Sequence, residues 1–124
     1  MKDKKTRPSI IEAFNAAIQG IIYTFKYERN MKIHYIIAVA VLIISLRFDL
    51  NKFEMMILIL SISLVIISEM FNTAIENTVD LVTDKYHYLA KIAKDVAAGG
   101  VLISALNAVA VGYLMINLQI YLNH

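Results

Sequence analysis

Four polar side chains recur at helical spacing in the middle of the sequence, and their types are those that handle protons and metal ions. They are Glu69, Asn72, Glu76 and Asp80, separated by three, four and four positions. At about 100° per residue, these positions fall on one stripe of an α-helix. Carboxylates serve as general bases and as ligands for hard cations, so the stripe predicts acid–base or metal-assisted chemistry.

Glu69 is expected to lie at depth in a membrane. It follows 14 uncharged residues, 55–68, which would carry it about 21 Å along a helix. That distance places Glu69 in the hydrocarbon near one membrane boundary, with Glu76 and Asp80 emerging from it. An acid at such depth is costly and is a functional candidate by default. The structural alternatives are a protonated or lysine-paired Glu69 and a merely solvated Asp80.

A basic set follows the acidic stripe. His87, Lys91 and Lys94 are spaced by four and three positions, and Asp95 stands beside them. Lysines just outside a bilayer usually anchor to lipid headgroups, and Lys91 and Lys85 are expected to do so. Lys94 borders the next apolar stretch, where its charge would neutralise the stripe or bind phosphate.

Glu28, much earlier in the chain, is expected to reach the same membrane boundary as Glu76. A base in low dielectric, carboxylates for a divalent cation and a lysine for phosphate are the parts that phosphoryl transfer needs. The sequence has no cysteine, no HExxH and no GxxxxGK[ST] motif, which argues against zinc and against a P-loop. Spacing alone predicts an intramembrane site of carboxylates and Mg²⁺, and no more.

The composition indicates which elements hold these residues. AVILMFWYC make up 59% of the 124 residues and only 18% are charged, which is too apolar for a soluble domain or a disordered chain. The formal net charge of +2 gives no case for a nucleic-acid partner. Three long runs without charge predict one all-α integral membrane domain over residues 1–124. Its spanning helices are expected at about residues 31–48, 52–82 and 85–121.

The N-terminal part predicts a different kind of helix, over about residues 9–26. Ser9 and Glu12 form a capping-box pattern at its start. Apolar residues then recur on one face, at Ile10, Phe14, Ile18, Ile21 and Phe25, with polar residues opposite. This pattern is typical of a helix lying in the membrane interface, and a helix packed on a partner shares it.

Lysine and arginine counts predict the orientation. Residues 1–32 hold seven, residues 47–52 two, residues 85–94 three, and the tail none. By the positive-inside rule the N-terminus and the site are cytoplasmic and the C-terminus is outside. The basic cluster over residues 2–7 resembles the start of a signal peptide, but a polar helix follows it, so the segment is expected to be retained.

Small residues recur at every fourth position near the C-terminus, at Gly100, Ser104, Ala108 and Gly112. Such a stripe favours close contact between membrane helices. The contact would be either within one chain or between copies of it, and the spacing alone does not separate the two.

The acidic stripe and the residues after it resemble the signature of a known family. Residues 69–80 (EMFNTAIENTVD) and 86–98 (YHYLAKIAKDVAA) are similar to that of the prokaryotic diacylglycerol kinases, and the resemblance extends over nearly the whole chain. It implies a homotrimeric kinase of the bacterial plasma membrane, with a surface helix and three membrane spans per subunit. It also implies Mg-ATP as the phosphate donor.

The resemblance also implies roles for individual residues. Glu69 would be the general base on the hydroxyl of a membrane lipid, and Glu28 and Glu76 would hold the metal. Asn72 and Asp80 would support the site or bind substrate. The residues implied to bind ATP are Glu28, Glu76, Lys85, Tyr86, His87, Lys94 and Asp95.

Within this family, residues 28–30 (ERN) and 33–34 (IH) resemble the Gram-positive undecaprenol kinases. The implied product is undecaprenyl phosphate, and the alternative is phosphatidic acid made from diacylglycerol. Tryptophan, present in the Gram-negative branch, is absent here. Ser9 stands where that branch has a basic residue, and Lys85 replaces an acid. Any contact of Lys85 with the nucleotide is therefore expected through its backbone.

Two other classes of function remain open from the sequence. A small proton-coupled transporter also uses a membrane glutamate, but such proteins have four spans and few charges at the cytoplasmic boundary. A non-enzymatic assembly subunit would explain the small-residue stripe and leave the acidic stripe unexplained.

Overall fold

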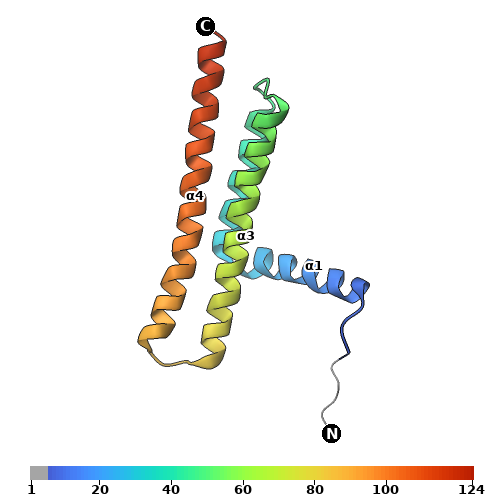
Figure 1. Cartoon of the computed structure of the whole chain (residues 1–124), viewed down its shortest axis with the longest axis vertical. Coiled ribbons are helices and arrows are strands. Elements are labelled where there is room, and N and C mark those ends of the chain that lie inside the picture. The colour runs from blue at the N-terminus through green and yellow to red at the C-terminus, as the bar shows by residue number, and fades with distance from the viewer. Residues whose placement is uncertain (1–5) are drawn as a thin grey trace.

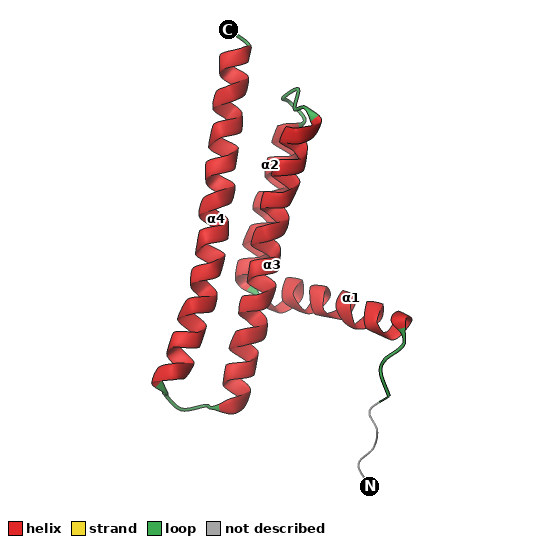
Figure 2. Ribbon diagram, in the orientation of Figure 1, coloured by secondary structure: helices red, strands yellow, loops and turns green. Residues whose placement is uncertain are grey.

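A computed structural model describes residues 6–124 as four α-helices joined by short connections (Figures 1 and 2). The helices are α1 (Ile10–Tyr27), α2 (Arg29–Ser45), α3 (Lys52–Val82) and α4 (Tyr88–Leu122). The expected all-α fold is confirmed. The first four residues of the basic cluster over residues 2–7 lie outside the described residues.

The capping box expected at Ser9 and Glu12 is formed, and a second one starts α3. The Ser9 side chain accepts a hydrogen bond from the Glu12 backbone N–H, and the Glu12 carboxylate accepts one from the Ser9 N–H. Asn51 and Glu54 repeat this arrangement at the start of α3. Each box satisfies backbone donors that the first turn of a helix leaves free, so it fixes where the helix begins.

A single extended residue separates the first two helices. Glu28 has φ −97° and ψ 114°, ends α1 and begins α2. The chain bends there, and α1 projects away from α2, α3 and α4, which run side by side (Figure 1). The most extensive packing between helices is that of α3 on α4. Both helices continue past the level at which α1 leaves the bundle (Figure 1).

The interior of this bundle is mostly polar. Nine of the thirteen buried residues are polar or charged, while long apolar side chains on all four helices face outward. Some of the polar side chains join helices: the Ser68 and Ser104 hydroxyls lie 2.6 Å apart, and Gln119 Nε2 donates to Glu54 Oε2 at 3.3 Å. Such an inverted distribution suits a bilayer, where lipid solvates the outer apolar surface and polar groups must be satisfied between helices.

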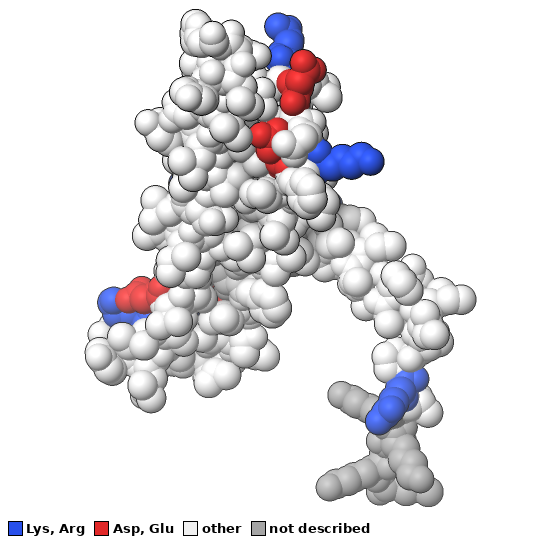
Figure 3. Space-filling model, turned by 45° about the horizontal axis from the view of Figure 1, so that its top comes forward, with Lys and Arg blue, Asp and Glu red and all other residues white. Residues whose placement is uncertain are grey.

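Within residues 6–124, two helices are long and apolar enough to cross a membrane, α3 and α4. Only 28% and 6% of their most apolar windows are buried within the chain, so neither resembles the core helix of a soluble protein. On the face drawn in Figure 3, charged side chains gather near the α2–α3 connection and near the α3–α4 loop, with an uncharged band between them. These features support a membrane protein.

Two helix ends differ from those expected. α2 ends at Ser45, and backbone hydrogen bonds from Arg47 to Ile44 and from Phe48 to Ser45 turn the chain toward α3. Its 17 residues span about 26 Å, short of a hydrocarbon core of about 30 Å, so the third span remains a prediction. α4 begins at Tyr88 and not near residue 85, because the His87 ring accepts a hydrogen bond from the Leu89 N–H and caps the helix.

Candidate active site

Glu69 is the most deeply buried ionisable side chain of α3. Its side chain is 1% exposed, and neither carboxylate oxygen has a hydrogen-bond partner among residues 6–124. The nearest cationic candidate is His34 of α2, whose Nε2 lies 3.6 Å from Glu69 Oε2. Buried polar groups in native proteins are nearly always paired, so an unpaired carboxylate indicates a binding or reacting group.

The next turn of α3 continues this polar cluster. Asn72 is buried, and its Nδ2 donates to Glu76 Oε1 at 3.4 Å. Asn72 Oδ1 and the hydroxyl of Thr73 are buried without a partner in the described part of the chain. Three residues within about one turn of α3, Glu69, Asn72 and Thr73, therefore hold polar atoms that are free to bind a ligand.

Glu28 approaches the same level from the junction of α1 and α2. Its side chain is half-buried, and it and Glu76 are the acidic groups whose charges act on Glu69. Among residues 6–124 no three histidine, aspartate or glutamate side chains converge closely enough to hold a metal ion unaided. Mg²⁺, however, commonly uses one or two carboxylates and completes its shell with phosphates and water. The donor chemistry of Glu28 and Glu76 fits a substrate-assisted Mg²⁺ site.

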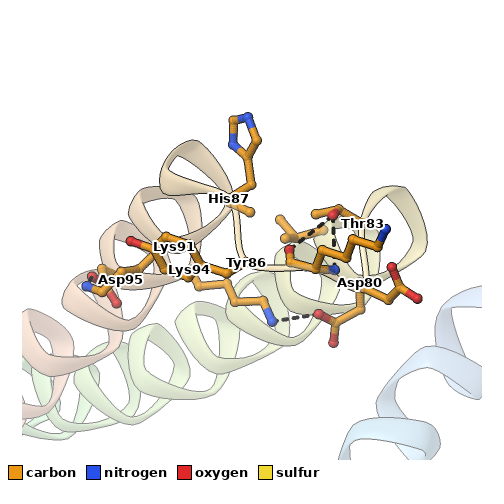
Figure 4. Close-up of a pocket in the computed structure, with 11 residues that line it drawn as sticks. Asp80, Thr83, Tyr86, His87, Lys91, Lys94 and Asp95 are labelled. Atoms are coloured by element: carbon orange, nitrogen blue, oxygen red, sulfur yellow. Dashed lines mark hydrogen bonds and ion pairs between the residues drawn. The ribbon is translucent and has the colours of Figure 1, made fainter.

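A separate open cleft of about 670 Å³ lies where α3 ends and α4 begins (Figure 4). It brings together five of the seven residues that the family resemblance assigns to ATP. These five are Lys85, Tyr86, His87, Lys94 and Asp95. Asp80 and Lys91 also line the cleft. Their mixture of cations, acids and an exposed aromatic ring can accommodate a charged molecule with an aromatic portion.

Two of the three lysines of the cleft, Lys94 and Lys91, form ion pairs with different partners. Lys94 Nζ donates to Asp80 Oδ1 at 2.6 Å, across the loop, whereas Lys91 pairs with Asp95 one turn along α4 (Figure 4). Lys94 therefore meets the acidic stripe, as the sequence predicts. His87 caps α4 and its ring points away from the Lys94–Asp80 pair, so the expected face of His87, Lys91 and Lys94 is not one surface (Figure 4).

The cleft and the Glu69 cluster are adjacent but distinct. Neither Glu28, Glu69 nor Glu76 lines the cleft. Eleven positions of α3 separate Asp80 from Glu69, a rise of about 16 Å, and Glu76 lies between them. A molecule bound in the cleft must extend along α3 to bring a reacting atom to Glu69.

Sequence reasoning gave no role to two polar residues of the cluster. Thr73 is four positions after Glu69 and is buried beside it on α3, a spacing that could have revealed it. His34 approaches Glu69 from another helix, and no spacing rule could have predicted that contact. Ser104 of the small-residue stripe packs within the chain, against Ser68.

Comparison with known proteins places this geometry in context. The family described as prokaryotic diacylglycerol kinase matches residues 15–116. The chain is 45% identical over 104 residues to the undecaprenol kinase of Bacillus subtilis, covering 84% of this chain and 85% of that protein. It is 44% identical over 106 residues to the diacylglycerol kinase of Synechocystis sp., covering 85% of this chain and 61% of that relative. Identity to the diacylglycerol kinase of Escherichia coli K12 is 31% over 100 residues, covering 81% and 82%.

Proposed function

Because this chain belongs to the prokaryotic diacylglycerol kinase family, we propose that it is an ATP-dependent lipid kinase that phosphorylates undecaprenol. The product is undecaprenyl phosphate. Diacylglycerol is the alternative acceptor, since a relative at 44% identity and another at 31% are diacylglycerol kinases. Both lipids present a primary hydroxyl at the membrane interface, so one catalytic site serves either.

The observation that carries the proposal is the buried carboxylate of Glu69, which has no hydrogen-bond partner among residues 6–124. Glu69 removes the proton from the lipid hydroxyl while the hydroxyl oxygen attacks the γ-phosphorus of ATP. The bond from this phosphorus to the bridging oxygen breaks, and ADP leaves with the electron pair. Burial keeps water from the site, which disfavours hydrolysis of ATP in place of transfer to the lipid.

Glu28 and Glu76 hold Mg²⁺ in this proposal. When bound, Mg²⁺ neutralises charge on the β- and γ-phosphates. Asn72 positions Glu76 through its 3.4 Å hydrogen bond, so one carboxylate oxygen of Glu76 is oriented and the other stays available. Positioning Glu76 is therefore the role that we propose for Asn72.

The nucleotide occupies the cleft between α3 and α4. Lys94 exchanges Asp80 for a phosphate, because both partners are partly exposed and their pairing is weak in water. Asp95, Lys85 and His87 lie along the same cleft. The 80% exposed ring of Tyr86 is available for stacking on the base. From there the triphosphate extends along α3 toward Glu76 and Glu69.

The membrane arrangement of the proposal has three spans, α2, α3 and α4, with α1 in the cytoplasmic interface. The projecting direction of α1 and its outward apolar side chains support this placement (Figure 1). The lysine and arginine distribution supports a cytoplasmic cleft and a C-terminus on the outside.

The assembly is a homotrimer in this proposal. A Cβ built on Gly100 or Gly112 would have no neighbour within 4 Å in the described chain, so packing within one subunit does not require glycine there. Helices of other subunits can approach closely at these positions.

The experiment is transfer of radiolabelled γ-phosphate from ATP to lipid by the purified protein in mixed micelles. Undecaprenol should be labelled only when Mg²⁺ and protein are both present. Labelling of neither undecaprenol nor diacylglycerol, by protein shown to be folded, would contradict the proposal. Proton-driven substrate uptake by reconstituted vesicles would then favour the transporter alternative.

A further inference from the structure

The buried position of Glu69 raises a question about where its proton goes. A base that takes a proton from a lipid hydroxyl must release it before the next turnover. Glu69 is 1% exposed, so direct transfer to bulk water is blocked. A proton therefore needs an intermediate carrier that touches both Glu69 and solvent.

We propose that His34 is that carrier, a positioning residue that receives the proton from Glu69 and passes it to solvent. The inference rests on the proposed lipid kinase function. His34 Nε2 lies 3.6 Å from Glu69 Oε2, and the His34 side chain is 19% exposed. Of the two partners, the histidine is thus the one that reaches water.

The chemistry of histidine suits the task. Imidazole changes charge between about pH 5 and 8, and its two nitrogens allow a proton to enter at one and leave from the other. The contact is longer than a hydrogen bond, and catalytic hydrogen bonds often tighten only when substrate is bound. The other ionisable groups that act on Glu69 are Glu28 and Glu76, and both are assigned to the metal.

The proton balance of one turnover is complete. The lipid hydroxyl loses its proton to Glu69 as its oxygen bonds to the γ-phosphorus, and ADP departs with the electrons of the broken bond. Glu69 then gives the proton to the free Nε2 of neutral His34, whose Nδ1 releases one to water. Exchange of the ring proton through water returns it to Nδ1 and frees Nε2 again. Glu69 is then a carboxylate and His34 is neutral in its starting tautomer, so both are ready for the next turnover.

The test compares His34→Gln with His124→Gln, which makes the same change at the C-terminus, far from the site. We expect His34→Gln to lower kcat about 10- to 100-fold with little change in KM for either substrate, and His124→Gln to leave both unchanged. The pH profile of kcat should also differ between the wild type and His34→Gln.

Chemical rescue separates proton transfer from structural support. Added imidazole should restore part of the kcat of His34→Ala and should not restore Glu69→Gln. A fixed ion pair between His34 and Glu69 would instead give an unstable variant with no rescue and an unchanged pH profile, and that outcome would overturn the inference. If wild-type protein itself transfers no phosphate to lipid, the proposed function fails. If it is active and His34→Gln matches it at every pH, only the proton relay fails.

Discussion

Lys94 of α4 and Asp80 of α3 form an ion pair whose Nζ–Oδ1 distance is 2.6 Å, 14 positions apart in the sequence. The pair joins the cleft proposed to bind the nucleotide to the acidic stripe that carries Glu69. Its side chains are 39% and 63% exposed, so water competes for both partners and the pair adds little to stability. A bound phosphate can therefore take Lys94 from Asp80 without unfolding the loop.

The first prediction follows from that exchange. Lys94→Gln removes the charge that would meet phosphate, and we expect KM for ATP to rise about tenfold or more with thermal stability unchanged, because charge-assisted hydrogen bonds to phosphate are stronger than neutral ones. Initial rates at varied ATP measure it. The control is Lys52→Gln at the opposite end of α3, which should leave KM for ATP alone. An unaltered KM for ATP in Lys94→Gln would exclude phosphate binding by Lys94.

The second prediction concerns Mg²⁺. Glu28 and Glu76 lie 48 positions apart in sequence, yet both act on Glu69. Changing either to Gln should raise the Mg²⁺ concentration needed for half-maximal activity or abolish activity, because a neutral amide is a weaker ligand for a hard cation. Titration of activity with Mg²⁺ measures the shift, with Asp49→Asn in the α2–α3 connection as the control. Wild-type Mg²⁺ dependence in both glutamate variants would mean that the ion is held elsewhere.

The third prediction concerns lipid choice. Phe25 of α1 contacts Tyr35 of α2 edge-to-face, with ring centroids 5.0 Å apart, so the end of the apolar face of α1 lies beside α2. We expect the apolar surface at this junction to bind branched hydrocarbon and to leave the ester oxygens of diacylglycerol unpaired, at about 1–3 kcal/mol per group. Competition between the two lipids in one micelle should give the higher kcat/KM for undecaprenol. A clearly higher kcat/KM for diacylglycerol would contradict the prediction and identify diacylglycerol as the substrate.

The fourth prediction concerns the end of the bundle where α3 begins and α4 ends. Glu54 is buried, accepts a hydrogen bond from the Asn51 N–H in the capping box of α3 and accepts another from Gln119 of α4. Glu54→Ala should lower stability by about 1–2 kcal/mol, because it removes this half of the capping box and leaves Gln119 without its partner. Thermal unfolding in detergent measures the change. Gln119→Leu should cost less, since the capping box survives. Equal losses in the two variants would show that the Glu54 half of the box contributes nothing.

Sequence patterns predict the local structure of this chain well and its long-range contacts poorly. The capping boxes at Ser9 and Asn51 depend on residues three positions apart, so the sequence reveals them directly. The stripe from Glu69 to Asp80 is likewise a matter of helical period. His34, by contrast, meets Glu69 through the packing of α2 on α3, and no local pattern encodes that contact.

The helix ends show the same limit. The short loop after Thr83 places His87 where its ring caps α4, which moves the start of the helix to Tyr88. A helical spacing of His87 with Lys91 suggested one continuous face. In the structure His87 caps α4 and is not part of its first turn. Whether a residue caps a helix or extends it depends on the conformation of the loop before it, which no helical spacing encodes.

The central claim is that Glu69 is the base that activates a lipid hydroxyl, and the most direct measurement is turnover of undecaprenol by Glu69→Gln. This substitution preserves the size of the side chain and removes its basicity. We expect the wild-type protein to transfer the γ-phosphate of ATP to undecaprenol. We expect the variant to do so at least about 10²-fold more slowly while its oligomer keeps the same size. Near-normal turnover by the purified variant would contradict the account.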